Sequence, residues 1–278
     1  MHNRLRTVIL LGVLTGFIMG FGQFLGGSHG LMIGFVIAMV MNLGSWWFSA
    51  DMVLAQTRAK VVQPEDAPEL YNLVAHLAER ASLPMPRVAI VNDPSPNAFA
   101  TGRNPNRAVV AVTSGLLNIM NREELAGVLG HELAHVKNRD ILIGSVAAVL
   151  AGVIMFLASI AKFGAIFGGG NRDGEGGNPL AVLLMAILAP LAAGLIQAAI
   201  SRAGEYQADD TGADIAGTPY GLASALEKLG GSRPSTQAQA NTAHLYIVNP
   251  LSARSMASLF ATHPPIEERV ARLRGLRP

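Results

Sequence analysis

The chain has 278 residues, of which half are hydrophobic and only 14% are charged, against about 25% charged in an average soluble domain. This composition excludes a disordered chain, a coiled coil and an ordinary water-soluble enzyme. The net charge is +2 without a long basic block, so nucleic-acid binding is not expected, and the lack of cysteine leaves only His and carboxylate side chains as metal ligands.

Three apolar stretches predict four membrane-spanning helices. Residues 7–50 contain no charged side chain and are long enough for two crossings of about 20 residues each, with a turn at residues 26–30. Residues 141–167, whose one charge is Lys162, and residues 179–200 predict the third and fourth spans. We therefore expect a mainly α-helical membrane protein.

The charges that flank these stretches predict the orientation. The first apolar stretch is too long for a cleaved signal peptide, so we interpret it as an anchor. Lys and Arg residues lie outside the spans on one side: Arg4, Arg6, Arg58, Lys60, Lys137, Arg139 and Arg202. By the positive-inside rule, both termini and the polar part of the chain face the cytoplasm.

The remaining polar sequence predicts an α+β domain in two parts, residues 51–140 and 201–278. The transmembrane hairpin at residues 141–200 is inserted between them, and residues 1–50 form an N-terminal hairpin. Apolar periodicity and turn residues predict helices at residues 64–80, 121–140, 219–229 and 265–273, and strands at residues 87–91, 97–102 and 107–112. Asn121 is a favourable N-cap for the second of these helices.

The predicted helix at residues 121–140 contains the motif HELAH. Its two histidines, His131 and His135, are four residues apart and therefore lie on one face of the helix, where both imidazoles can bind one metal ion. Glu132 lies beside them, where it can reach a water on that ion. This pattern indicates a zinc-dependent hydrolase.

A catalytic zinc ion takes three protein ligands and keeps one position for water. A third His six residues after His135 is excluded, because that position is Ile141. The candidate glutamates are Glu175, Glu205, Glu227, Glu267 and Glu268. We choose Glu205, which follows the fourth predicted span on the same side as His131. Asp209, one turn later, can accept the second ring N–H of a ligand histidine.

At these positions the chain resembles a known family. The HELAH motif, the segment SRAGEYQAD at residues 201–209 and the THPP at residues 262–265 are similar to those of the HtpX heat-shock membrane metalloproteases, relatives of the CAAX prenyl proteases. The resemblance implies a zincin-like catalytic domain of the gluzincin type that binds one Zn²⁺ per chain. It also implies proteolysis of misfolded or damaged membrane proteins at the cytoplasmic face of a bacterial inner membrane, with polypeptide substrates and the lipid bilayer as partners.

The resemblance also implies roles for residues that spacing alone leaves open. His263 and Arg269 match a family pair that contacts the transition-state oxyanion or orders the site. Asn97, Ala98, Phe99 and Ala100 match an edge strand that binds the substrate backbone by β-augmentation. Asp140 and Tyr206 are interpreted as structural.

Geometry adds a constraint on the site. His135 lies just before the third predicted span and Glu205 lies just after the fourth. Because all ligands must lie about 2 Å from one ion, the hairpin has to bring its two ends together. We therefore expect the site close to the bilayer surface.

Two alternative functions stay open. A specific processing protease would use the same chemistry on one defined substrate. A non-enzymatic membrane protein with a structural zinc ion is the second alternative, and the free carboxylate of Glu132 argues against it, since a structural site needs no base.

Overall fold

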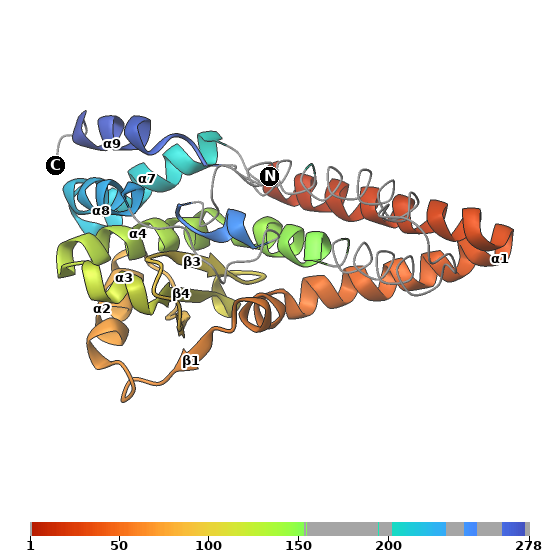
Figure 1. Ribbon diagram of the computed structural model, residues 1–278, viewed down its shortest axis with the longest axis horizontal. Helices are drawn as coiled ribbons and strands as arrows, with labels where there is room; N and C mark the ends of the chain where they lie inside the picture. Colours follow the sequence, from red (N-terminus) through yellow and green to blue (C-terminus); the bar gives the residue numbers. More distant parts are fainter. Residues whose placement is uncertain are drawn as a thin grey trace, which may run out of the picture.

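The computed structural model describes residues 2–152, 154, 194, 202–231, 242–248 and 263–275. Figure 1 shows an elongated molecule in which a long helical hairpin, α1, projects from a globular part built of a small sheet and several helices. The chain is thus mainly helical with a small sheet, as predicted. Most of the third and fourth predicted spans lies outside the described residues.

Helix α1 (His2–Thr57) is folded back on itself at Gly26 and Gly27. Gly27 has φ 59°, a left-handed conformation that favours glycine. The two arms approach closely because Gly22 and Gly30 pack backbone against backbone, and a Cβ at either position would collide with the carbonyl oxygen of the other. The predicted turn at residues 26–30 is therefore confirmed at its first two residues, and the second arm continues beyond residue 50 to Thr57.

The second arm is the part of the described chain that is long and apolar enough to cross a membrane. It runs over Gly26–Thr57 with a mean hydropathy of 1.7, and only 17% of its most apolar window is buried against the rest of the protein. The core helix of a soluble domain would be mostly buried instead. The first arm contributes a shorter apolar helix, Thr7–Gly20, and Asn42 Nδ2 donates to Thr15 Oγ1 across the hairpin at 2.8 Å.

The sheet has four strands in the order β1-β2-β4-β3. Their bounds are β1 (Lys60–Val62), β2 (Arg87–Val91), β3 (Ala98–Thr101) and β4 (Val109–Thr113). Strands β2 and β4 are parallel, whereas β1 and β3 run antiparallel to their neighbours, which leaves β3 at an edge. The three predicted strands are confirmed to within two residues. Strand β1 was not predicted, because it is short and largely exposed.

The helices of the globular part lie on one face of the sheet. They are α2 (Pro68–Arg80), α3 (Ser114–Ile119), α4 (Arg122–Asn138), α7 (Arg202–Ala216), α8 (Tyr220–Gly230) and α9 (Ile266–Gly275), with 3-10 turns η1 (Pro105–Arg107) and η2 (Ala243–Leu245). Apolar side chains of α2, α4 and α8 pack against one face of the sheet in the main core, and the end of α1 packs against the other face.

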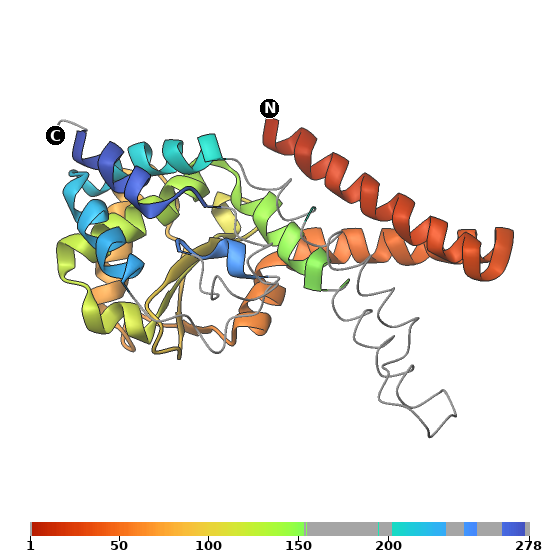
Figure 2. The ribbon, with the colours of Figure 1, turned by 45° about the horizontal axis from the view of Figure 1, so that its top comes forward.

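Helix α4 has well-defined ends. Asn121 and Glu124 form a capping box in which each side chain accepts a hydrogen bond from the backbone N–H of the other. The helix ends at Asn138, two residues earlier than predicted, because Arg139 is left-handed with φ 58°. The chain then enters the apolar helix Ile141–Gly152, which leaves α4 toward the α1 hairpin (Figure 2).

Candidate metal centre

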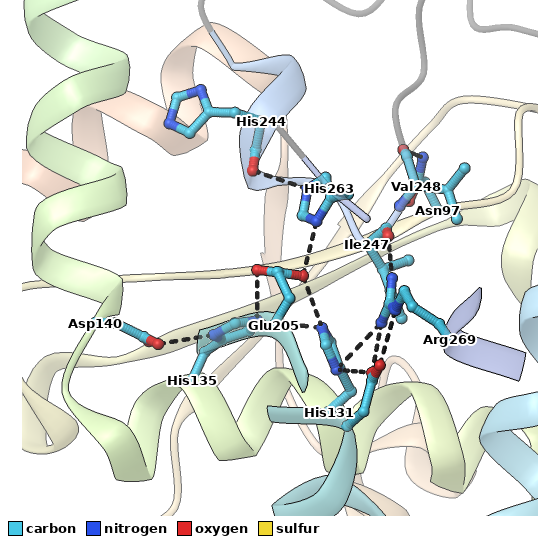
Figure 3. Close-up of polar contacts among 11 residues, drawn as sticks. Asn97, His131, His135, Asp140, Glu205, His244, Ile247, Val248, His263 and Arg269 are labelled. Atoms are coloured by element: carbon cyan, nitrogen blue, oxygen red, sulfur yellow. Dashed lines mark hydrogen bonds and ion pairs between the residues drawn. The ribbon is translucent and has the colours of Figure 1, made fainter. Parts of the chain in front are cut away.

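Three predicted ligands, from helices α4 and α7, converge on one point (Figure 3). His131 Nε2 lies 3.1 Å from His135 Nε2 and 3.9 Å from Glu205 Oε2, and His135 Nε2 lies 3.6 Å from Glu205 Oε1. Zinc bonds of 2.0–2.2 Å in a tetrahedron separate ligand atoms by roughly 3.4 Å. The three side chains therefore fit a tetrahedral ion.

Two glycines let the ligand helices approach closely enough. A Cβ on Gly212 of α7 would lie 2.7 Å from the His131 backbone nitrogen, and one on Gly130 of α4 would lie 2.6 Å from the Gly212 carbonyl oxygen. The two backbones thus touch one residue before the first ligand, where side chains larger than hydrogen do not fit. This contact brings α4 and α7 together directly beside His131.

Glu132 is buried beside the ligands. Glu132 is only 2% exposed, and its Oε1 has no hydrogen-bond partner among the described residues. Burial raises the pKa of Glu132 to about 8, although His135 and the backbone N–H of Ala100 favour its charged form. A buried carboxyl oxygen without a partner is unfavourable, so its presence here suits a group that acts on a water or ligand.

Each of the two predicted ligand histidines has its own carboxylate partner. Asp209 Oδ1 lies 2.9 Å from His131 Nδ1, and Asp140 Oδ2 lies 3.0 Å from His135 Nδ1. Such a contact fixes the ring so that Nε2 is left for a metal. Asp209 was expected in this position. Asp140 was interpreted as structural, and it reaches His135 because α4 ends at Asn138 and the chain turns at Arg139.

The electrostatic environment of His131 and Glu205 favours the protonation states that bind a metal. Burial lowers the pKa of His131 to about 4, against the opposing effect of Asp209, so its imidazole is neutral near pH 7. Burial alone would raise the pKa of Glu205, but the surrounding histidines outweigh it and hold this pKa well below 4.5. A neutral imidazole and an ionised carboxylate are the forms that bind a metal.

Arg269 is completely buried and bound to groups of its own chain. Its Nε and Nη2 donate to Asp209 at 2.9 and 2.6 Å, and its Nη1 donates to the carbonyl oxygen of Ile247 at 3.0 Å. Nη2 also lies 3.4 Å from His131 Nδ1. Of the two roles implied by the resemblance, these contacts favour ordering the site over contact with an oxyanion.

His263 lies directly at the predicted ligands. Its Nδ1 is 2.7 Å from Glu205 Oε2, and its Nε2 is 3.2 Å from the carbonyl oxygen of His244 (Figure 3). The imidazole therefore lies between the third predicted ligand and the segment at residues 242–248.

The predicted substrate strand corresponds to β3 and the residue before it. All four of its predicted residues are buried. The side chain of Asn97 and the carbonyl oxygen of Ala98 are bonded to Val248 and Ile247 of the same chain, at 2.7 and 3.0 Å. Part of this edge is thus occupied by the protein itself.

Comparison with known proteins agrees with this arrangement. The model of peptidase family M48 matches residues 64–277. A protein of Desulfatibacillum aliphaticivorans named protease HtpX homolog is 58% identical to this chain, over 100% of this chain and 91% of the relative. A protein of Thermococcus kodakarensis with the same name is 54% identical, over 98% of this chain and 95% of the relative.

A solved structure shares the fold. The crystal structure of S. mikatae Ste24p aligns with a TM-score of 0.51 at 19% identity, over 98% of this chain and 65% of that protein. The resemblance to the HtpX proteases is confirmed by the sequence relatives, whereas the likeness to Ste24p concerns the fold alone. The chain belongs to peptidase family M48 and is a metallopeptidase.

Proposed function

We propose that this metallopeptidase is a zinc-dependent endopeptidase of the cytoplasmic membrane that hydrolyses misfolded or damaged membrane proteins. One observation carries the proposal: His131, His135 and Glu205 converge within 4.8 Å of one another, with the buried, partly unpartnered carboxylate of Glu132 beside them. Three ligands and a free base are what a hydrolytic zinc site requires. A structural zinc site would not need the fourth group.

The chemistry follows from this set of residues. A bound zinc ion supplies a Lewis acid for the scissile carbonyl and lowers the pKa of a water. Glu132 accepts a proton from the attacking water on its carboxylate and returns it to the leaving amine nitrogen. Asp209 and Asp140 hold the two imidazoles in their ligand orientation, since each contacts one Nδ1.

His263 and Arg269 have different roles in this proposal. We assign His263 to the oxyanion, because its ring lies 2.7 Å from Glu205 and thus beside the reacting centre. We assign Arg269 to ordering Asp209, since two of its nitrogens are bonded to that carboxylate.

The placement in the membrane is part of the proposal. Helix α4, which carries two ligands, leads after a two-residue link into the apolar helix Ile141–Gly152, and Gly26–Thr57 is long enough to cross a bilayer. We propose four spans, with residues 141–200 inserted into the catalytic domain and with both termini and the site at the cytoplasmic face of a bacterial inner membrane. Reporters fused at Gly174 and Pro278 should then report opposite sides of the membrane, and a result on one side would exclude the second hairpin.

The metal assignment is tested on the purified full-length protein in detergent. A chelator should abolish cleavage of an unfolded polypeptide, and added Zn²⁺ should restore it. Glu205→Ala should purify largely without zinc and without activity, whereas the matched Glu267→Ala, which removes an exposed glutamate of α9, should behave like the parent. Parental zinc affinity in Glu205→Ala would show that the third ligand lies elsewhere.

The substrate class is tested in cells. Membrane proteins are compared by mass spectrometry between cells with the parent and cells with Glu132→Gln. Accumulation of many damaged membrane proteins would support quality control. Accumulation of one unprocessed membrane protein would favour a specific processing protease instead.

A further inference from the structure

The outer edge of β3 is partly covered by a short segment from the C-terminal part of the chain. Asn97 O accepts a hydrogen bond from Thr113 N at 2.9 Å, so Asn97 faces β4, and the next residue, Ala98, faces outward by the alternation of an antiparallel pair. At this outward position, Ile247 N donates to Ala98 O at 3.0 Å. Ile247 thus pairs with β3 on the side away from the rest of the sheet.

All four backbone polar groups of Ile247 and Val248 are bonded to this edge or to Arg269. Besides the contact with Ala98, Arg269 Nη1 donates to Ile247 O at 3.0 Å. The carboxamide of Asn97 binds Val248 twice, donating to its carbonyl oxygen at 2.7 Å and accepting from its N–H at 3.3 Å (Figure 3). The groups that bind these four polar atoms therefore recognise peptide backbone, and the buried side chain of Ile247 adds apolar contact with the main core.

The pairing of Ile247 with β3 is connected by direct contacts to the candidate metal centre. Ala100 is the next outward-facing residue of β3, and its backbone N–H stabilises the Glu132 carboxylate. On the other side, Arg269 connects Ile247 to Asp209, which contacts His131. A peptide bonded at this edge would thus lie next to the proposed base and to one proposed ligand.

We infer that Ile247 and Val248 act as an internal substitute for the substrate backbone, which an extended polypeptide must displace before it can be cleaved. An extended polypeptide offers the same N–H and carbonyl groups, so the exchange replaces each of the four hydrogen bonds with an equivalent one. Tyr246 keeps the segment near the edge, because its ring packs edge-on against Phe99 with a centroid distance of 5.1 Å. The enzyme is therefore self-inhibited at this edge. This inference rests on the proposed function and adds how substrate access is controlled.

A variant that weakens the internal pairing tests the inference. Ile247→Pro removes the N–H that donates to Ala98, and Tyr246 already has the extended conformation, φ −77° and ψ 144°, that a residue before proline prefers. One backbone hydrogen bond corresponds to about two- to twelvefold in an equilibrium. KM for an unfolded polypeptide should fall by about that factor, with kcat unchanged. Glu267→Ala is the control, because it removes an exposed glutamate of α9 outside this segment, and its KM should equal that of the parent.

An unchanged or raised KM in a folded, zinc-loaded Ile247→Pro protein would overturn the inference. A second measurement does not depend on that variant. Hydrogen exchange is followed at the amides of Ile247 and Val248 in zinc-loaded Glu132→Gln, with and without a saturating reduced and carboxymethylated polypeptide. Both amides should lose protection when the polypeptide is added.

The two measurements separate the inference from the proposed function. Continued protection of the two amides in the presence of the polypeptide would show that Ile247 and Val248 stay paired with this edge, and it would overturn the inference whether or not the parent is active. Absence of zinc-dependent cleavage by the parent would overturn the proposed function itself.

Discussion

The close contact between α4 and α7 makes the metal centre sensitive to a single methyl group at Gly212. The Cβ introduced by Gly212→Ala would lie 2.7 Å from the backbone nitrogen of His131 and 2.8 Å from its Cα, whereas an ordinary contact begins at 3.4 Å. Both atoms belong to the backbone of a helix, so no side chain can rotate away. The two helices must separate by about 0.7 Å or tilt, while metal–ligand distances tolerate only about 0.2 Å.

This displacement predicts two separate losses. Overpacking should lower the free energy of unfolding by about 1–3 kcal/mol. The shift of Glu205 relative to His131 should weaken zinc binding by about 10–100-fold, as is typical when ligand positions are disturbed. Zinc affinity is measured by competition with a chelator and stability by thermal unfolding. Gly275→Ala is the control, because a Cβ there meets nothing within 4 Å. Parental zinc affinity in Gly212→Ala would refute the reasoning that this contact sets the ligand geometry.

Two further variants test a support of the site and an anchor of the fold. Asp140→Asn should reduce zinc affinity by about 10–100-fold in chelator competition, whereas the exposed control Asp214→Asn should not. If Asp140→Asn binds zinc as tightly as the parent, Asp140 has a purely structural role. Burial alone would raise the pKa of Glu124, but Lys228 Nζ at 2.6 Å and the helix cap outweigh it and lower this pKa. Its stabilising contribution is therefore present above the unfolded pKa of about 4.3 and is lost as the pH falls through the lower folded value. Glu124→Gln should lower the free energy of unfolding at pH 7 by about 1–3 kcal/mol, and in urea titrations the difference from the parent should shrink toward pH 3. A loss of the same size at both pH values, or an equal loss in the exposed control Glu123→Gln, would contradict stabilisation by the ionised Glu124.

Local sequence patterns predicted the elements whose causes are local. The spacing of His131 and His135 places both on one helical face, and Asn121 with Glu124 marks the start of α4 in the sequence itself. Strands β2 and β4 follow from runs of Val, Ile and Ala that form the buried centre of the sheet. For these helices and strands, the local sequence alone is enough to predict the structure.

The parts that the sequence did not reveal depend on contacts between distant residues or on one unusual backbone conformation. Asp140 reaches His135 because Arg139 turns the chain in a left-handed conformation, which side-chain periodicity does not indicate. The pairing of Ile247 with Ala98 joins residues about 150 positions apart and uses only backbone groups, so no side-chain pattern marks it. Arg269 was predicted at the site, but its contacts with Asp209 became visible only once α9 was packed beside α7.

The most direct test of the account compares zinc content and proteolysis in one preparation of Glu132→Gln. The substitution leaves the proposed ligands His131, His135 and Glu205 in place and removes only the group proposed to accept the proton. The account predicts one zinc ion per chain, as in the parent, with polypeptide cleavage reduced by about 10²–10⁴-fold. Cleavage near the parental rate would show that Glu132 is not the base, and loss of zinc from the variant would show that Glu132 instead maintains the metal centre.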